Sequence, residues 1–362
     1  MDHICPPFDS GRSGEFARDV REKVEEYFNQ TGRSEAADLS VWLKSIILSV
    51  AYFGSYVLLL VAQPAWPLAW LLCVVMGLGL AGLGFSVAHD ALHGAYSTNP
   101  RINRALALIF EALGGNGYAW RLSHNGAHHG LPNVSGHDDD VDVSPLLRLS
   151  PHSAHRGIHR FQHLFAFGLY ALATLNWALV KDFAFFSRRK PRCGAPGPAD
   201  WTGLLVGKLL FYGAMAAPFV VVEAPVWVIV TGLLTVHLVA GLTIGTVFQL
   251  AHAVEVVEHL PATDASKAKG AWAAHQLRTT SNFAAGNRLL GWYIGGLNYQ
   301  VEHHLFPRIC HAHYPAISGI VEASARRHGL PYNSIPTLGQ ALGAHYRMLR
   351  RLGESPASSR PV

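Results

Sequence analysis

Cysteine is scarce in this sequence. The four cysteines among 362 residues are far apart, and none forms a CxxC pair: Cys5, Cys73, Cys193 and Cys310. This spacing argues against a cysteine metal site and gives no disulfide framework. It is consistent with a reducing compartment on the polar side of the protein.

Charge is also scarce, because charged residues make up 15% of the chain and hydrophobic residues 50%. Soluble domains carry about a quarter charged residues, so much of this surface is not expected to face water. The mean hydropathy of +0.18 is low for a simple bundle of membrane spans and predicts an additional polar part. The net charge of +5 is not arranged as a basic stripe with aromatics, so no nucleic-acid partner is expected.

Long apolar runs occur in two pairs, at about 42–62 with 65–88 and at 204–222 with 226–250. Each run approaches the roughly 20 residues that a membrane-spanning helix needs. Short connections at Gln63-Pro64 and Glu223-Ala224-Pro225 join the members of each pair. The sequence therefore predicts an all-α membrane protein with four transmembrane helices in two hairpins and a cytosolic helical cap.

The domain plan follows from these runs. Residues 1–40 are charged and polar, without a cleavable signal peptide, and are expected to form a cytosolic N-terminal segment with an amphipathic helix at 15–30. Residues 41–320 form the membrane domain, and residues 321–362 a cytosolic C-terminal segment. The chain is expected to enter the membrane through an internal span.

The distribution of Lys and Arg predicts the orientation. Neither short connection contains Lys or Arg, whereas Ser187-Arg-Arg-Lys-Pro-Arg192 precedes the third run. By the positive-inside rule, both termini and the section between the pairs face the cytoplasm. The protein is expected in a bacterial inner membrane with its active site on the cytoplasmic face.

Two further apolar stretches complicate the topology. Ile102–Leu113 is too short to span, and Phe161–Val180 is long enough but flanked by charged residues and His163. An odd number of spans here would put the histidine clusters described next on opposite faces. Both stretches are therefore predicted to be interfacial or re-entrant helices.

Histidine is the residue in excess, with 21 copies against four methionines. Three clusters follow apolar runs, each on the predicted cytoplasmic side: His89-Asp-Ala-Leu-His93, His124-Asn-Gly-Ala-His128-His129 and Gln300-Val-Glu-His303-His304. Histidines four apart on an α-helix share one face, and adjacent histidines can serve two different metals. Imidazole suits iron, copper, nickel or zinc, so the ligand type alone leaves the metal open.

Other residues extend the candidate site. His252, just beyond the fourth run, would bring the count of histidine ligands to eight, enough for two metal ions with four nitrogens each. Gln300 could ligate weakly through its amide oxygen, hold water, or hydrogen-bond a ligand. Ligating imidazoles usually donate their second N–H to a carboxylate or carbonyl, and Asp90, Asp138 and Glu302 are candidates for that role.

These motifs resemble the membrane fatty acid desaturases. The order H-xxx-H, H-xxx-HH, Q-xx-HH is typical of them, and Gly296–Pro307 is similar to the acyl-lipid or linoleoyl-CoA branch with its front-end members. Phe248–His252 and Gln276–Phe283 are similar to the same branch. The resemblance covers roughly residues 40–320. It implies a non-haem di-iron centre, with the seven cluster histidines and His252 as ligands, and dioxygen as co-substrate for inserting a double bond into a fatty acyl lipid or thioester.

The resemblance also bears on electron supply. Many front-end desaturases carry a fused cytochrome b5 domain with a His-Pro-Gly-Gly motif, and this sequence has no such motif. Electrons are therefore expected from a separate ferredoxin or cytochrome b5, reduced through an NAD(P)H-dependent reductase. The basic stretch Arg188–Arg192 is a candidate docking patch for an acidic donor.

Two alternatives remain at this point. A membrane di-iron hydroxylase, ketolase or epoxidase would use the same histidines and transfer oxygen to the lipid. A metal transporter would need ionisable residues at mid-membrane depth, where His237 alone lies well inside a predicted span.

Overall fold

The computed structural model describes residues 14–141, 145–187 and 195–354. These residues are mainly helical, with two short strands. The chain forms two compact units. Unit 1 comprises Met1–Glu35, Arg121–Ala166 and Val247–Val362, and unit 2 comprises Ala36–Trp120 and Phe167–Thr246.

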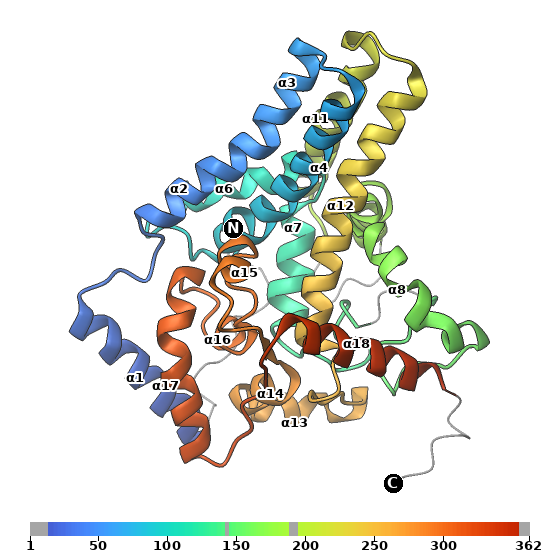
Figure 1. The fold of residues 1–362 in the computed structure, drawn as a ribbon. Coiled ribbons are helices and arrows are strands. Elements are labelled where there is room, and N and C mark those ends of the chain that lie inside the picture. Colours follow the sequence, from blue (N-terminus) through green and yellow to red (C-terminus); the bar gives the residue numbers. More distant parts are fainter. Residues whose placement is uncertain (1–13, 142–144, 188–194, 355–362) are drawn as a thin grey trace. The chain divides into compact units, whose positions relative to one another are not determined.

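Unit 2 begins with two long helices (Figure 1). Each of them contains a π-helical turn. Their segments are α2 (Leu39–Ser49), η2 (Val50–Gly54) and α3 (Ser55–Ala62), then α4 (Trp66–Leu83), η3 (Gly84–Ala88) and α5 (His89–His93). The two helices pack closely: a Cβ on Gly79 would lie 2.9 Å from the backbone nitrogen of Tyr52. A small residue at this position lets the two backbones approach each other.

The rest of unit 2 consists of shorter helices and two further long ones. They are α6 (Pro100–Ala112), α7 (Gly117–Trp120), α9 (Ala173–Asn176), η6 (Trp177–Lys181), α10 (Asp182–Phe186), α11 (Pro198–Val221) and α12 (Val226–His252), whose last residues belong to unit 1. The two short connections between long helices meet. The Gln63 side chain donates a hydrogen bond to the carbonyl of Val221 and accepts one from the amide of Glu223.

Four helices in the described part of the chain are long and apolar enough to cross a membrane: Leu39–Ala62, Trp66–His93, Pro198–Val221 and Val226–His252. Each helix covers nearly all of one predicted apolar run and extends beyond it by a few residues at one end. Many large apolar side chains on these helices are exposed, for example Leu209 (72%) and Val220 (87%). Such outward-facing side chains fit a lipid environment.

The predicted interfacial stretch 161–180 is not one straight helix. α8 (Gln162–Ala171) and the helical segment Ala173–Phe186 are bent by 61° at Leu172, and they would make a fifth span only as a pair. Gly241 of α12 packs against the bend, because a Cβ there would collide with the carbonyl oxygen of Ala171. The interfacial placement of this segment stays a prediction.

Unit 1 contains helices shorter than the four apolar ones, and it buries hydrophobic clusters as well as histidines. The helices are α1 (Glu15–Thr31), η4 (Arg121–His128), η5 (Gly157–Phe161), the start of α8, η7 (Ala262–Asp264), α13 (Ala265–Gly270), α14 (Trp272–Thr279), α15 (Arg288–Tyr293), α16 (Gln300–Leu305), η8 (His311–His313), α17 (Tyr314–Arg327) and α18 (Leu338–Gly353). Strands β1 (Asn282–Phe283) and β2 (Ser334–Ile335) pair in parallel.

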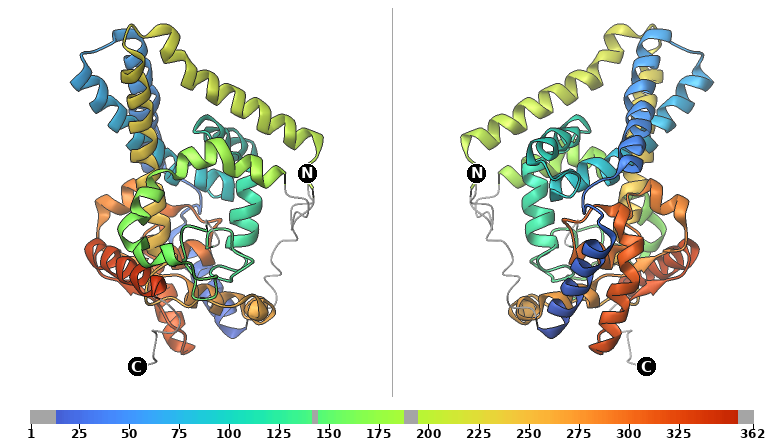
Figure 2. Two further views of the ribbon diagram at one scale, coloured as in Figure 1. Left: turned by 90° about the vertical axis from the view of Figure 1, so that its right-hand side faces the viewer. Right: turned by 90° about the vertical axis from the view of Figure 1, so that its left-hand side faces the viewer.

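α1 is the predicted amphipathic helix. Its apolar face, with Phe16, Val20, Val24 and Phe28, is buried, and α1 lies alongside α17 in both views of Figure 2. Burial of such a stripe is the main reason that a helix of this length is stable. The backbone after α1 is fixed by a hydrogen bond from the amide of Cys310 to the carbonyl of Glu35.

Candidate metal centre

The first histidine pair lies in unit 2, in the last turn of the helix Trp66–His93. His89 and His93 are both buried, and their ring centroids are 4.6 Å apart, as expected for residues four apart on an α-helix. Trp120 packs edge-on against both rings, at 5.5 and 5.3 Å. Oδ1 of Asp90 lies 3.6 Å from Nδ1 of His89.

The second cluster adopts a different backbone. The spacing of His124 and His128 favoured an α-helix, but this segment is the π-helix η4. A hydrogen bond of 2.9 Å from the amide of His129 to the carbonyl of His124 closes its turn. The wider turn brings the rings of His124 and His129 together, with 3.2 Å between their Nε2 atoms. His128 also stays close to His124, at 5.1 Å between centroids. π-turns are rare and often occur at functional sites.

Unit 1 brings six of the predicted histidines into one buried cluster. The three histidines of η4 meet one from the end of α12 and two from α16: His124, His128, His129, His252, His303 and His304. Ring centroids are 4.5 Å apart for His128 and His252, and 4.3 Å for His129 and His304. His252 is the last residue of α12, so this helix continues two residues past its predicted end.

Four of these rings are oriented by a hydrogen bond at Nδ1. The partners are Asp138 for His128 (3.0 Å), Tyr314 for His303 (3.1 Å), Gln276 for His304 (2.8 Å) and the Thr279 carbonyl for His252 (3.2 Å). A carboxylate, an amide oxygen and a carbonyl can only accept, so a neutral ring facing them donates from Nδ1. Its Nε2 lone pair is then available to a metal.

The donor atoms fit a metal ion. One nitrogen each of His128, His252 and His304 lies within 4.8 Å of the other two, and all three residues are buried. His124, His128 and Asp140 form a second such group. Imidazoles with a nearby carboxylate, without thiolate, suit non-haem iron as well as zinc, copper or nickel.

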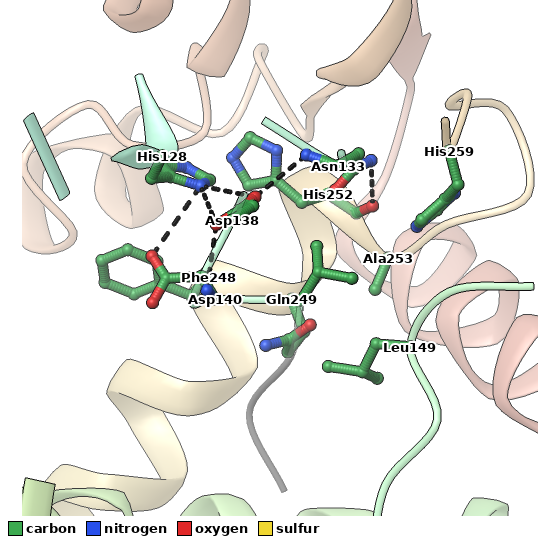
Figure 3. A pocket seen from close by; sticks show the side chains of 11 residues that line it. His128, Asn133, Asp138, Asp140, Leu149, Phe248, Gln249, His252, Ala253 and His259 are labelled. Atoms are coloured by element: carbon green, nitrogen blue, oxygen red, sulfur yellow. Dashed lines mark hydrogen bonds and ion pairs between the residues drawn. The ribbon is translucent and has the colours of Figure 1, made fainter. Parts of the chain in front are cut away.

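Two carboxylates serve this cluster (Figure 3). Asp138 is fully buried and also accepts hydrogen bonds from the backbone amides of Asn133 and Asp140. Burial would raise the pKa of Asp138, but the charge and hydrogen bond of His128 outweigh it and hold that pKa below its usual value. Asp140, 26% exposed, places Oδ2 at 3.7 Å from Nδ1 of His124. Asp142, the next carboxylate after Asp140 in the sequence, lies outside the described residues.

Glu302 takes a different position from the one expected. Its carboxylate accepts hydrogen bonds from Asn282 and Tyr332 rather than from a cluster histidine. Burial raises the pKa of Glu302 to about 7. Asn282 also accepts from the amide of Val301, so this group fixes α16 against β1. Gln300 is the buried first residue of α16, and its role as a ligand stays a prediction.

Three orienting residues were not identified from the sequence: Gln276, Tyr314 and Asn133. Gln276 lies in the stretch 276–283 that resembles the desaturases, which was an available signal. Tyr314 follows His303 by 11 residues, and Asn133 contacts segments more than 100 residues away. Motif spacing carries no information about contacts of this kind.

The chain is similar to known proteins along most of its length. Residues 64–336 match the model of the fatty acid desaturase family. The sn-1 linoleoyl-lipid 6-desaturase of Synechocystis is 34% identical over 344 residues, covering 94% of this chain and 96% of that protein. The enzyme of the same name from Arthrospira platensis is 31% identical, covering 96% and 95%. The acyl-lipid (8-3)-desaturase of Physcomitrium patens is 31% identical, covering 92% and 71%.

Proposed function

Because the chain belongs to the fatty acid desaturase family, we propose that it is an oxygen-dependent acyl-lipid desaturase with a non-haem di-iron centre. The observation that carries the di-iron proposal is the buried cluster of six imidazoles in unit 1, four of them held by a hydrogen bond at Nδ1. In three of these the partner can only accept, so that Nε2 can coordinate. We include His89 and His93 as further ligands on the basis of their motif and burial.

When bound, the iron pair supplies the dioxygen chemistry that removes two hydrogens from adjacent methylenes. The overall balance is one dioxygen, two electrons and two protons consumed per double bond, with two waters released. The residues of the chain fix the directions of the imidazoles by hydrogen bonds and keep the site buried, away from bulk water. Orientation of this kind selects which carbons react. The electrons come from a separate donor of the ferredoxin or cytochrome b5 type with an NAD(P)H-dependent reductase.

We propose an acyl chain esterified to a glycerolipid as the substrate, in preference to a thioester. Three of the relatives are named as desaturases of acyl chains in lipids, and the protein is an integral membrane protein by its family and its four apolar helices. The names of these relatives differ in the position of the double bond. The position is therefore left to be measured.

We further propose that the four spans form two hairpins with the metal centre on the cytoplasmic side. The contact between Gln63 and the residues Val221 and Glu223 supports this arrangement, because it joins two connections that lack Lys and Arg. Single-cysteine reporters in a background without native cysteines test it. Cysteines at His155 and Ser187 should both react from the cytoplasm. If one of the two positions reacted only from the opposite side of the membrane, residues 157–186 would cross the bilayer.

We also propose that the basic stretch Arg188–Arg192 docks the electron donor. This stretch lies outside the described residues.

Expression in a bacterial host fed with defined fatty acids tests the activity. Mass spectrometry that locates double bonds should find a new unsaturation in glycerolipid fatty acids, dependent on the expressed protein. A His303→Ala variant, inserted at the same level, is the control and should give no product. A hydroxylated product would instead identify the oxygen-transferring alternative, and a product only on thioesters would contradict the proposed carrier.

A further inference from the structure

Asn133 lies at the junction of three segments that surround the metal-binding cluster. It follows η4, is completely buried, and has a left-handed backbone with φ of 58°. Its backbone amide donates to Oδ2 of Asp138 at 2.9 Å. Its carbonyl accepts from the amide of Leu260 at 3.0 Å. Non-glycine residues seldom adopt this conformation, and asparagine tolerates it better than most.

The Asn133 side chain acts as a donor to three backbone carbonyls. Nδ2 lies 2.9 Å from the carbonyl oxygen of His252, 3.1 Å from that of Glu258 and 3.3 Å from that of Thr279. These carbonyls define the orientation of the amide, because the flipped form would put Oδ1 against three oxygens. The first belongs to a proposed ligand, and the third accepts the Nδ1 hydrogen bond of that ligand.

From these contacts we infer that Asn133 is a positioning residue for the metal centre, acting on two ligands at once. Through its amide it holds the Asp138 carboxylate that orients His128, and through its side chain it holds the backbone of His252 (Figure 3). The same side chain also holds the Thr279 carbonyl that orients the His252 ring. The nitrogens of His128 and His252 belong to one candidate metal group. Asn133 thus fixes the angle between two ligands without touching the metal.

The chain offers a matched control in the same unit. Gln162 is also completely buried, and its side chain makes three hydrogen bonds to the backbone. Nε2 donates to the carbonyls of Arg148 and Leu349, and Oε1 accepts from the amide of Arg148. Truncating Gln162 therefore removes as many side-chain hydrogen bonds as truncating Asn133, but none that involve a proposed ligand or its partner.

The experiment uses the full chain in detergent micelles. Iron retained against a competing chelator gives the relative affinity, and the visible spectrum of the cobalt(II)-loaded protein reports the ligand geometry. Asn133→Gly preserves the backbone conformation and deletes the side chain. We expect it to lower iron affinity about 10- to 100-fold, as loss of an orienting partner does, and to change the cobalt spectrum. Gln162→Ala should lower the melting temperature while leaving the affinity and the spectrum at wild-type values.

Two results would overturn the inference. One is an Asn133→Gly variant with the iron affinity and cobalt spectrum of the wild type. The other is a Gln162→Ala variant whose iron affinity falls, and whose cobalt spectrum changes, as much as in Asn133→Gly. Asn133→Asp is nearly isosteric but faces the three carbonyls with an oxygen, and it should lose at least as much affinity as Asn133→Gly. The inference rests on the proposed metal centre. If the wild-type chain holds no iron, the proposed function fails; if the wild type holds iron and Asn133→Gly holds it equally well, only the inference fails.

Discussion

The two regions that carry the histidine motifs position their imidazole rings with different backbone structures. In unit 2, His89 and His93 end a long apolar helix and share its face, with Trp120 against both rings. In unit 1, His124, His128 and His129 lie on or beside a π-helix and meet residues from other segments. One pair is positioned by helix periodicity, and the other cluster by contacts distant in sequence.

The cluster in unit 1 is held in place by side chains that are distant in sequence and bind the backbone around it. Around the cluster in unit 1, neutral side chains from several segments bind backbone carbonyls: His275 binds that of Pro132, His345 that of Ala253 and Trp272 that of His129. The histidine excess of the sequence thus includes residues that support the site from outside. Buried polar networks of this kind stabilise a unique arrangement when all members are satisfied.

The largest expected effect comes from removing the ligands themselves. His128→Ala or His303→Ala should lower desaturation more than about 100-fold, beyond the effect of losing an orienting partner, and should lower bound iron, measured by elemental analysis. His93→Ala should do the same if both regions serve one centre. His328→Ala, which alters a partly exposed histidine beside Asp19, is the control. Full iron and activity in His93→Ala would mean that the two regions do not share the centre.

The next-largest effect is expected on the free energy of unfolding, and it comes from the buried His275 in unit 1. Burial lowers the pKa of His275 to about 4, although its bond to the Pro132 carbonyl acts in the opposite direction. Between about pH 4 and 6.5 the unfolded chain then binds more protons than the folded one. Stability should therefore fall as the pH drops through this window, and this one residue should cost about 2 kcal/mol at pH 5 relative to pH 7.5.

His275→Gln keeps a donor near the Nε2 position and removes the titration. Denaturant unfolding in detergent at pH 7.5 and at pH 5 should therefore show a smaller difference in this variant than in the wild type. His155→Gln, which changes a half-buried ring that binds the Gly353 carbonyl, controls for the loss of an imidazole–carbonyl bond. If wild type and His275→Gln lose the same stability on acidification, the neutral buried state of His275 is wrong.

The regular part of the fold could be predicted from the sequence, because apolar periodicity and length depend on local residues. The amphipathic helix α1 and the four apolar helices were found in this way. The bend at Leu172 and the π-helix η4 could not, because each depends on packing against distant segments, such as Gly241 against Ala171. Likewise, the spacing of the histidines indicated a metal site, but Asn133 and Tyr314 orient it through contacts that no motif records.

A moderate loss of iron affinity is expected when Asp138, the buried carboxylate beside His128 in unit 1, is changed. Asp138→Asn removes the negative charge facing Nδ1 of His128 and retains the size of the side chain. Iron affinity should fall about 10- to 100-fold, the range for partners of ligating histidines, and chelator competition measures it. Asp19→Asn, at a partly exposed carboxylate bound to Ser324 and Arg327, should leave the affinity unchanged. Unchanged affinity in Asp138→Asn would contradict the role of this carboxylate.

The smallest loss of iron affinity is expected when Asp90, the carboxylate beside His89 in unit 2, is changed. Asp90 is buried, but its Oδ1 lies 3.6 Å from Nδ1 of His89, whereas Asp138 lies 3.0 Å from Nδ1 of His128. A separation of 3.6 Å exceeds hydrogen-bonding distance, so Asp90 acts on His89 mainly through its charge. Asp90→Asn should therefore lower iron affinity less than about 10-fold, below the range for a hydrogen-bonded partner. An effect as large as that of Asp138→Asn would mean that a carboxylate orients the first pair too, and that helix periodicity alone does not position His89 and His93.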